Sequence, residues 1–561
     1  MEKKSSGWRG ILPMGGVILG VWLVLLITAT QSTFWERDES RYATAALEME
    51  TSGNWLYPTF NHELRAFKPV MVYWLMAVSI QAFGPTEISI RLVSAVAIAL
   101  VCLLTGLIAR EFLGSGVWAA AIAGMSPVLI LTGSAATTDA TLLMFILLSQ
   151  WVFVRRWLDG PRRWHVSVMA VAIGLAMLTK GPVGLAIPVL TIATALALAK
   201  GRSKAGIFAW KLTVAALGGI VIFLAWGIPA NAATGNEYWQ IAIARYLPKY
   251  LFSAMEGHGG QGLIPFLLHL PYYPLVLAAG FLPWTVYLML VPGSFRRIQP
   301  APEANDWARS REGLRVLLAG MILPTFILMT LMVSKLPHYI LPVFPWFAIV
   351  VASALRAAQT APFAATAARR MQWVFFATGI LGCLGAAALF LVPWIWVPLQ
   401  VFRGAGVVMG VLLLVLTAVL LWFSWPDRIL TAVKIQLCGM AVLVLAGAFY
   451  LLPPLEKTVK PAQLLAREIR SQIPPETSVA TFGWGEPGMH FYLGAPRINH
   501  ILDRAVLEDW LAGGGPRVLI LNEAAAPGLA LPPEGFRLLS TRGGIDHVRG
   551  RVIRLSAFLR D

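Results

Sequence analysis

Charged residues are scarce in this chain of 561 residues: 13% are Asp, Glu, Lys or Arg, whereas 57% are hydrophobic. The mean hydropathy is +0.69, far above the values typical of soluble domains. The low charge content therefore excludes an ordinary soluble protein and indicates a membrane protein.

Cysteine is also scarce. The chain has three, Cys102, Cys383 and Cys438, and each lies within an apolar run. Because no CxxC pair or zinc-type spacing occurs, the sequence excludes a disulfide framework and a cysteine-based metal site.

Acidic residues are few relative to basic ones, which gives a formal net charge of +17. The Lys and Arg residues fall in short clusters between apolar runs, as the topology signals of membrane proteins do, and not on one soluble face. This distribution argues against a nucleic-acid partner and in favour of membrane lipids.

Apolar runs long enough to cross a bilayer predict about 13 transmembrane helices. The runs cover about 11–30, 90–109, 116–134, 139–154, 164–179, 182–199, 207–229, 272–292, 314–333, 339–355, 372–398, 403–424 and 429–452. The first run indicates an uncleaved anchor, although small residues near Thr28 and Thr30 leave cleavage as the alternative. A shorter run from Val70 to Phe83 fits either a span or an interfacial helix.

The distribution of Lys and Arg residues between the loops indicates how the chain is oriented in the membrane. If residues 70–83 do not span and the N-terminus is cytoplasmic, the inside segments hold about twice as many Lys and Arg residues as the outside loops, as the positive-inside rule expects. The same orientation places a set of polar residues on one outer side. These residues are Asp38, Lys68, Asp139, Lys180, His258, Lys335 and Tyr339.

The tail after about Pro453 then lies outside as well. It contains an amphipathic stretch from Pro461 to Ile473 and strand-like segments at 478–482 and 517–521. We expect a transmembrane domain over residues 1–456 and a small soluble α/β domain over residues 457–561.

The first outside loop carries an acidic and basic cluster that includes Asp38, Glu39, Arg41 and Tyr42. A helix starting here presents Asp38, Arg41 and Tyr42 on one face. The carboxylate suits proton acceptance, and the guanidinium and phenol suit phosphate oxygens. The alternative is a helix start with acidic residues near its positive end.

Other polar residues stand at the outer ends of the predicted spans. Asp139 begins one span, where an ionisable group is a functional candidate or a helix cap. Lys68 and Lys180 suit a lipid phosphate, with snorkelling to the interface as the alternative. Lys335 and Tyr339 add donors in a turn, while His258 in a Gly-rich loop is either a solvated residue or a metal ligand.

Six segments occur in an order seen in a known family: WERDESRYA, SGNWLYP, FKPVMVYW, TTDATLL, LTKGPVG and SKLPHYILPVFP. This set, from about Trp35 to Pro345, resembles the lipid A aminoarabinose transferases, which are related to the protein O-mannosyltransferases. The resemblance implies a GT-C fold in the bacterial inner membrane and a polyprenyl (undecaprenyl) phosphate sugar donor used at the periplasmic face. It also implies lipid A or another envelope glycolipid or protein as acceptor.

The resemblance further implies roles for single residues. Asp38 matches a catalytic carboxylate and Asp139 matches an aspartate that supports the site, so we group both as catalytic candidates. Arg41, Tyr42, Lys68 and Tyr339 match residues that hold the donor phosphate. We group Glu39, Lys180, His258 and Lys335 with them as substrate-binding residues.

The sequence departs from the family at two places. The family usually has Glu-Lys-Pro where this chain has Phe67-Lys68-Pro69, and the loop around His258 lacks the paired histidines or adjacent arginine. Both departures weaken the expectation of aminoarabinose as the sugar. A divalent metal has weak support, and we expect no other cofactor.

The expected reaction is a single displacement at the anomeric carbon with inversion. Alternatives within the same chemistry are a protein O-mannosyltransferase or another polyprenyl-phosphate-sugar transferase. Alternatives from other classes are a lipid or sugar transporter (flippase) and a membrane scaffold.

Overall fold

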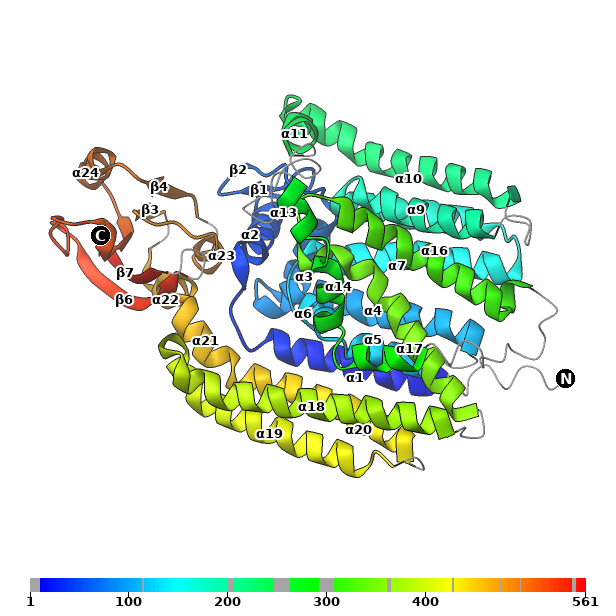
Figure 1. Cartoon of the computed structure of the whole chain (residues 1–561). Helices are drawn as coiled ribbons and strands as arrows, with labels where there is room; N and C mark the ends of the chain where they lie inside the picture. Colours follow the sequence, from blue (N-terminus) through cyan, green and yellow to red (C-terminus); the bar gives the residue numbers. More distant parts are fainter. Residues whose placement is uncertain are drawn as a thin grey trace.

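A computed structural model describes residues 11–113, 116–199, 206–246, 263–291, 307–360, 365–425, 428–474, 476–494, 496–546 and 551–561. Figure 1 shows a long bundle of roughly parallel and antiparallel helices with a small sheet domain at one end. The expected class, an all-α polytopic membrane protein with a C-terminal α/β domain, is confirmed.

The helices follow the apolar runs of the sequence. Their bounds up to the middle of the chain are α1 Ile11–Ala29, α2 Glu36–Ser52, α3 Met71–Phe83, α4 Glu87–Leu113, α5 Val117–Gly124, α6 Pro127–Gly133, α7 Thr138–Asp159, α8 Trp164–Lys180, α9 Val183–Leu198, α10 Gly206–Ala233 and α11 Glu237–Trp239. Those that follow are α13 Leu263–Leu268, α14 Tyr272–Gly280, η3 Trp284–Leu290, α16 Arg311–Leu331, η5 Pro337–Val343, α17 Phe344–Thr360, α18 Ala365–Ile395, α19 Arg403–Trp422, α20 Ile429–Tyr450 and α21 Leu452–Val459.

Nine helices within the described residues are long and apolar enough to cross a membrane, and α8 and α9 are shorter apolar helices. Two of the predicted runs are broken. The α14–η3 pair bends by 102°, and α5 ends before Ser126-Pro127. Proline explains both breaks, because it lacks a backbone N–H and restricts the residue before it.

The ambiguous run from Val70 to Phe83 forms α3, which has 13 residues. At 1.5 Å per residue it is about 20 Å long, shorter than a hydrocarbon core of about 30 Å. One side of α3 is buried, including Val72, Tyr73 and Met76, so this helix packs at the end of the bundle instead of spanning it.

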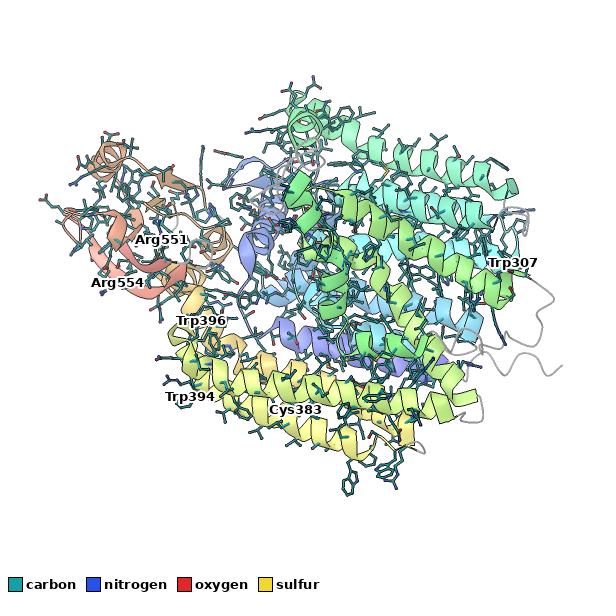
Figure 2. The ribbon with its side chains drawn as sticks, in the orientation of Figure 1. Trp307, Cys383, Trp394, Trp396, Arg551 and Arg554 are labelled. Atoms are coloured by element: carbon teal, nitrogen blue, oxygen red, sulfur yellow. The ribbon has the colours of Figure 1, made fainter. Side chains whose placement is uncertain are left out.

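One end of the bundle gathers the loops that matter for function. Figure 1 shows α2, α3, α11 and the hairpin of β1 (Thr59–Phe60) and β2 (Glu63–Leu64) beside the sheet domain, whereas α1 begins at the opposite end. Figure 2 shows Trp394 and Trp396 at the end near the sheet domain and Trp307 at the other. Tryptophan is enriched at both membrane surfaces, so these residues mark the two ends of the spanning region.

The C-terminal domain contains a five-stranded sheet in the order β4-β3-β5-β7-β6. The strands are β3 Ser478–Phe482, β4 Ile498–Ile501, β5 Arg517–Asn522, β6 Arg537–Asp546 and β7 Arg551–Arg560, with helices α22 Pro461–Ile469, α23 Gly488–Tyr492 and α24 Arg504–Ala512. β3 pairs in parallel with β4 and β5, and β7 pairs antiparallel with β5 and β6. The strand segments and the amphipathic helix predicted for this tail are confirmed.

The domain is attached to the first loop by hydrogen bonds between segments far apart in sequence. Asn61 pairs with the backbone of Ile498 in both directions, at 3.0 and 2.8 Å. The Lys460 ammonium donates to the Thr33 carbonyl at 2.6 Å, and the Tyr492 hydroxyl accepts from the Phe34 N–H at 2.8 Å. The loop that carries Asp38 is therefore held on the sheet domain as well as on the bundle.

His490 gives this interface a dependence on pH. Its side chain is 1% exposed, and its ring centroid lies 4.7 Å from that of Phe60 and 5.4 Å from that of His500. Burial lowers the pKa of His490 to about 3, with further contributions from His500 and His62. In the unfolded chain the imidazole takes up a proton near pH 6.5, whereas in the folded chain it does not. The contribution of His490 to the free energy of unfolding is therefore fully present above pH 6.5 and is lost as the pH falls below that value.

We expect His490 to account for a loss of about 2 kcal/mol in unfolding free energy at pH 5. Thermal unfolding of the full chain in detergent, measured from pH 8 to pH 5, tests this. A His490→Phe variant should lose less stability over the same range. If its pH profile matches that of the unchanged protein, His490 does not cause the effect.

Candidate active site

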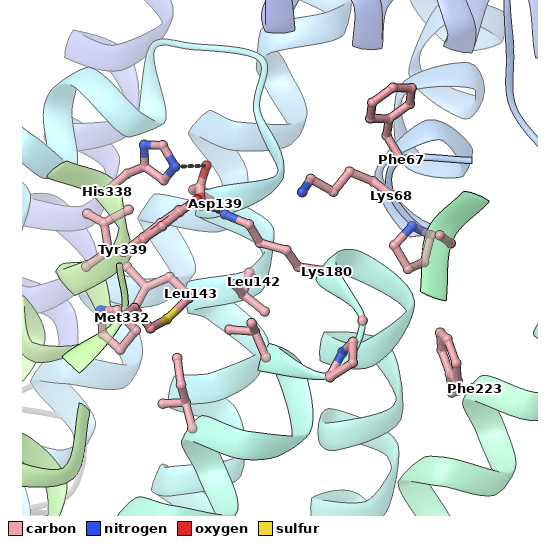
Figure 3. A pocket seen from close by; sticks show the side chains of 18 of the residues that line it. Phe67, Lys68, Asp139, Leu142, Leu143, Lys180, Phe223, Met332, His338 and Tyr339 are labelled. Carbon is pink, nitrogen blue, oxygen red and sulfur yellow. Dashed lines mark hydrogen bonds and ion pairs between the residues drawn. The ribbon is translucent and has the colours of Figure 1, made fainter. Parts of the chain in front are cut away.

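A cavity opens among the loops at this end of the bundle. Figure 3 shows that Lys68, Lys180 and His338 approach Asp139 from different elements. Most other lining residues are apolar, including Leu142, Leu143, Phe223, Val183, Ile187, Met329, Met332 and Leu341. The cavity thus has a charged mouth and an apolar interior, which suits an amphiphile with an anionic head.

Asp139 lies at the centre of the charged mouth. It stands in the first turn of α7, where the positive end of the helix dipole favours a carboxylate. Lys180, the last residue of α8, donates to Asp139 Oδ1 at 2.5 Å, and His338 Nε2 lies 3.9 Å from Oδ2. Gly181 follows in the left-handed region at φ +65°, so the chain turns sharply and Lys180 stays at the mouth.

Tyr339 and Lys68 complete this group. The Lys180 ammonium lies 5.3 Å from the centroid of the Tyr339 ring, within the range of a cation–π contact. Lys68 reaches toward Asp139 and Lys180 from the loop before α3 (Figure 3). Its backbone carbonyl accepts from the Tyr238 hydroxyl at 2.8 Å, which holds the residue at the cavity wall.

The ammonium of Lys68 has an unusual proton affinity. Burial and the nearby Lys180 lower its pKa to about 7, although Asp139 and Asp38 act in the opposite direction. An arriving anion would stabilise the charged form. Lys68 is therefore suited to bind a phosphate.

The predicted trio on α2 lies beside this mouth. Asp38 is exposed and forms a 3.7 Å ion pair with Arg41. Tyr42 is buried, with its ring centroid 5.7 Å from that of Tyr73 and 5.5 Å from the Arg65 guanidinium. Burial and the charge of Asp38 raise the pKa of Tyr42, so its hydroxyl keeps its proton.

The chain resembles several known proteins. Residues 67–228 match the family described as dolichyl-phosphate-mannose-protein mannosyltransferase. The undecaprenyl phosphate-alpha-4-amino-4-deoxy-L-arabinose arabinosyl transferase 2 of Sodalis glossinidius is 28% identical over 401 residues, which cover 69% of this chain and 66% of that protein. The corresponding transferase of Erwinia tasmaniensis is 28% identical over 451 residues, which cover 76% of this chain and 74% of that protein.

The crystal structure of ArnT from Cupriavidus metallidurans bound to undecaprenyl phosphate has the same fold, with a TM-score of 0.76. The likeness covers 99% of this chain and 98% of that one at 20% identity. The chain is therefore similar in sequence to the aminoarabinose arabinosyl transferases and shares the fold of ArnT. Its match with the Sodalis protein spans slightly less than two thirds of that protein.

Three predicted site residues need separate treatment. Lys335 donates to the carbonyls of Met329, at 3.2 Å, and Thr330, and does not line the cavity. It stabilises the C-terminal end of α16, which corrects the expectation that it contacts substrate. His258 lies outside the described residues.

Glu39 requires a second correction, because its carboxylate is buried in a structural ion pair. Arg91 of α4 donates to it at 2.6 and 2.9 Å, and both side chains are 1% exposed. Glu39 also accepts from the backbone N–H of Trp35 and, at 2.8 Å, from that of Ala136. With its acceptor sites used in this way, Glu39 is a positioning residue and not a ligand of the substrate.

Arg91 and Arg65 were missed by the sequence analysis. Besides Glu39, Arg91 donates to the carbonyls of Ala29, Ser32 and Thr33 at 2.6, 2.7 and 2.9 Å. An arginine in an apolar span is a signal in its own right, because such residues are rare and almost always paired. Arg65 donates to the Tyr73 hydroxyl at 3.2 Å, but no pattern in its loop distinguishes it.

Among the residues that the structure describes, no group of three or more His, Cys, Asp or Glu side chains has an arrangement that could hold a metal ion. The charges at the cavity mouth are instead arranged around one carboxylate and several cations.

The Glu39–Arg91 pair can be tested by breaking it. Arg91→Met leaves a buried carboxylate without its cation, so we expect the unfolding free energy to fall by about 3–5 kcal/mol. Arg504→Met, which removes an exposed ion pair with Glu508, should cost no more than about 1 kcal/mol. Thermal unfolding of the purified chain measures both, and equal stability of the two variants would contradict the structural role of Arg91.

Proposed function

We propose that this chain transfers a sugar from a polyprenyl phosphate donor, of the undecaprenyl phosphate type, to lipid A or another envelope acceptor. The observation that carries the proposal is the cavity in which Lys68 and Lys180 lie around Asp139 above an apolar interior. The names of the relatives support the same chemistry, since they are called undecaprenyl phosphate-aminoarabinose arabinosyl transferases.

The donor would bind with its phosphate at the cationic mouth and its prenyl chain against the apolar lining. Lys68 and Lys180 provide ammonium groups for the phosphate oxygens, and Tyr339 and Arg41 are the further candidates. The electrostatic attraction between these groups and the phosphate is stronger in a water-poor site than in solution, because the effective dielectric constant is lower there. They would stabilise the charge that grows on the phosphate as it leaves.

The reaction would be one displacement. An acceptor oxygen attacks the anomeric carbon, the bond between that carbon and the phosphate oxygen breaks, and the electron pair leaves with the lipid phosphate. If the acceptor is a hydroxyl, its proton passes to the Asp38 carboxylate, which is exposed beside the cavity mouth. If the acceptor is a phosphate, it is already ionised, and Asp38 would orient it or stabilise positive charge on the sugar. Inversion at the anomeric carbon follows.

We place the site on the periplasmic face of the inner membrane, with the N-terminus in the cytoplasm and a periplasmic soluble domain over residues 457–561. Support comes from the excess of Lys and Arg in the opposite loops. A transporter fits less well, because transporters bind substrates near the bilayer midplane between paired repeats, whereas these ionisable groups lie at the ends of spans.

Asp38 is the first residue to change. Asp38→Asn should reduce transfer by about 10²–10⁴-fold with a hydroxyl acceptor, the range typical of losing a general base. Transfer from synthetic polyprenyl-phosphate sugars in membranes measures this. Glu63→Gln is the matched control, because it removes one negative charge from the same outer loop; equal losses in both variants would exclude a specific role for Asp38.

Lys68 predicts a pH dependence of donor binding. With a pKa of about 7, the ammonium is charged below pH 7 and is lost above it, so affinity for the donor should fall by up to about tenfold per pH unit above the pKa. Lys68→Arg should bind without this dependence, because arginine stays charged. Binding of a sugar-phosphate diester, which keeps one charge throughout, measures this; a profile shared by both proteins would contradict the assignment to Lys68.

A further inference from the structure

The segment that leads into α2 is held through its backbone. Thr33, Phe34 and Trp35 lie between α1 and α2, and each of their N–H groups donates to a side chain. The acceptors are the Glu456 carboxylate at 2.9 Å, the Tyr492 hydroxyl at 2.8 Å and the Glu39 carboxylate, respectively. Two of these three side chains belong to the C-terminal part of the chain, so the start of α2 depends on it.

Thr33 is bound on both sides by residues that are one helical turn apart. Glu456 of α21 accepts from its N–H, and the Lys460 ammonium donates to its carbonyl at 2.6 Å. Lys460 lies between α21 and α22, where Pro461 interrupts the helix. Figure 1 shows this junction beside the segment that rises from α1 to α2.

Lys460 is unusual because its side chain is only 1% exposed. Lysine is almost never fully buried unless its ammonium has partners. Besides the Thr33 carbonyl, the ammonium lies 3.6 Å from the centroid of the Trp35 ring, within the range of a cation–π contact. Both of these partners belong to the segment before α2.

Asp38 makes few contacts of its own. Among the residues that the structure describes, its carboxylate has one ion pair, at 3.7 Å from Arg41, and its side chain is 62% exposed. Its location is therefore set by the first turn of α2, whose N-cap is Trp35. A general base must come within about 3 Å of the proton that it accepts, and a displacement of about 1 Å can lower a rate by about 10²-fold.

We propose that Lys460 and Glu456 are positioning residues for Asp38. They bind the polar groups of Thr33 and the ring of Trp35, and this segment holds the first turn of α2 beside the cavity mouth. The proposal rests on the proposed function and adds to it that the C-terminal part of the chain supports the chemical step.

The first test removes the ammonium. Transfer is measured with the full chain in proteoliposomes, and Lys460→Met should lower kcat by about tenfold or more. The KM for the donor should change little, because Lys68 and Lys180 are untouched. Lys457→Met is the matched control, since it makes the same change at an exposed position of α21 and should leave kcat unchanged. A kcat that is equal in the two variants would overturn the proposal.

A double-mutant cycle separates positioning from a general loss of stability. If Lys460 acts through Asp38, then Lys460→Met should change the residual single-turnover rate of Asp38→Asn by less than about twofold. A further fall as large as that in the unchanged protein would overturn the proposal.

Glu456 offers a conservative variant. Glu456→Gln keeps an oxygen that accepts from the Thr33 N–H, whereas Glu456→Leu does not, so the Gln variant should exceed the Leu variant in kcat by about fivefold or more. Equal rates would exclude Glu456 from the role.

Hydrogen exchange tests the contact without turnover. Lys460→Met should speed exchange in peptides that contain Thr33 to Trp35 and leave the first turn of α7 unchanged, and Lys457→Met should alter neither. If the unchanged protein turns over no donor, the proposed function fails. Exchange at Thr33 to Trp35 that is the same with and without the Lys460 ammonium would overturn the positioning role by itself.

Discussion

The arrangement of the site depends on a buried ion pair between α2 and α4. Glu39 follows Asp38 directly, and Arg91 fixes it from the neighbouring span while also binding three carbonyls of the segment between α1 and α2. The same carboxylate accepts from Ala136, three residues before Asp139. One ionic contact thus orients both segments that carry the aspartates. A buried pair is costly to desolvate and is maintained only when its remaining donors and acceptors are satisfied, as the contacts of Arg91 and Glu39 are.

The cavity mouth combines strong charges with low exposure to solvent, since the Lys180 and Asp139 side chains are each 12% exposed. Lys180 and Asp139 interact at 2.5 Å, and the neighbouring Lys68 is held at a pKa of about 7 by burial and by Lys180. A site of this kind is most stable with an anion bound, because the anion relieves the repulsion between the cations.

Much of the fold was predictable because it follows from local patterns. Runs of apolar residues predicted the helices, and short strand-like apolar segments predicted β3 and β5. The clustering of Asp139, Lys180 and Tyr339 could be predicted because the assumed topology assigns each end of a span to one of the two membrane surfaces, and all three residues fall on the same surface. Local patterns do not predict contacts between residues far apart in the sequence. The ion pair between Glu39 and Arg91 is such a contact, so the sequence did not indicate which cation binds Glu39. Lys335 was misassigned because a turn rich in donors does not show whether those donors bind the adjacent helix end.

The contacts between the first loop and the sheet domain also determine the order in which the molecule matures. Thr33 and Phe34 bind Lys460 and Tyr492, and Asn61 binds Ile498, so these pairs join parts of the chain more than 400 residues apart. Long-range contacts of this kind form only after the intervening chain has been made and its closure entropy has been offset. The segment that bears Asp38 is synthesised more than 400 residues before the sheet domain, yet it reaches its final environment only when that domain has folded. The sheet domain therefore delays completion of the site until the domain itself is in place.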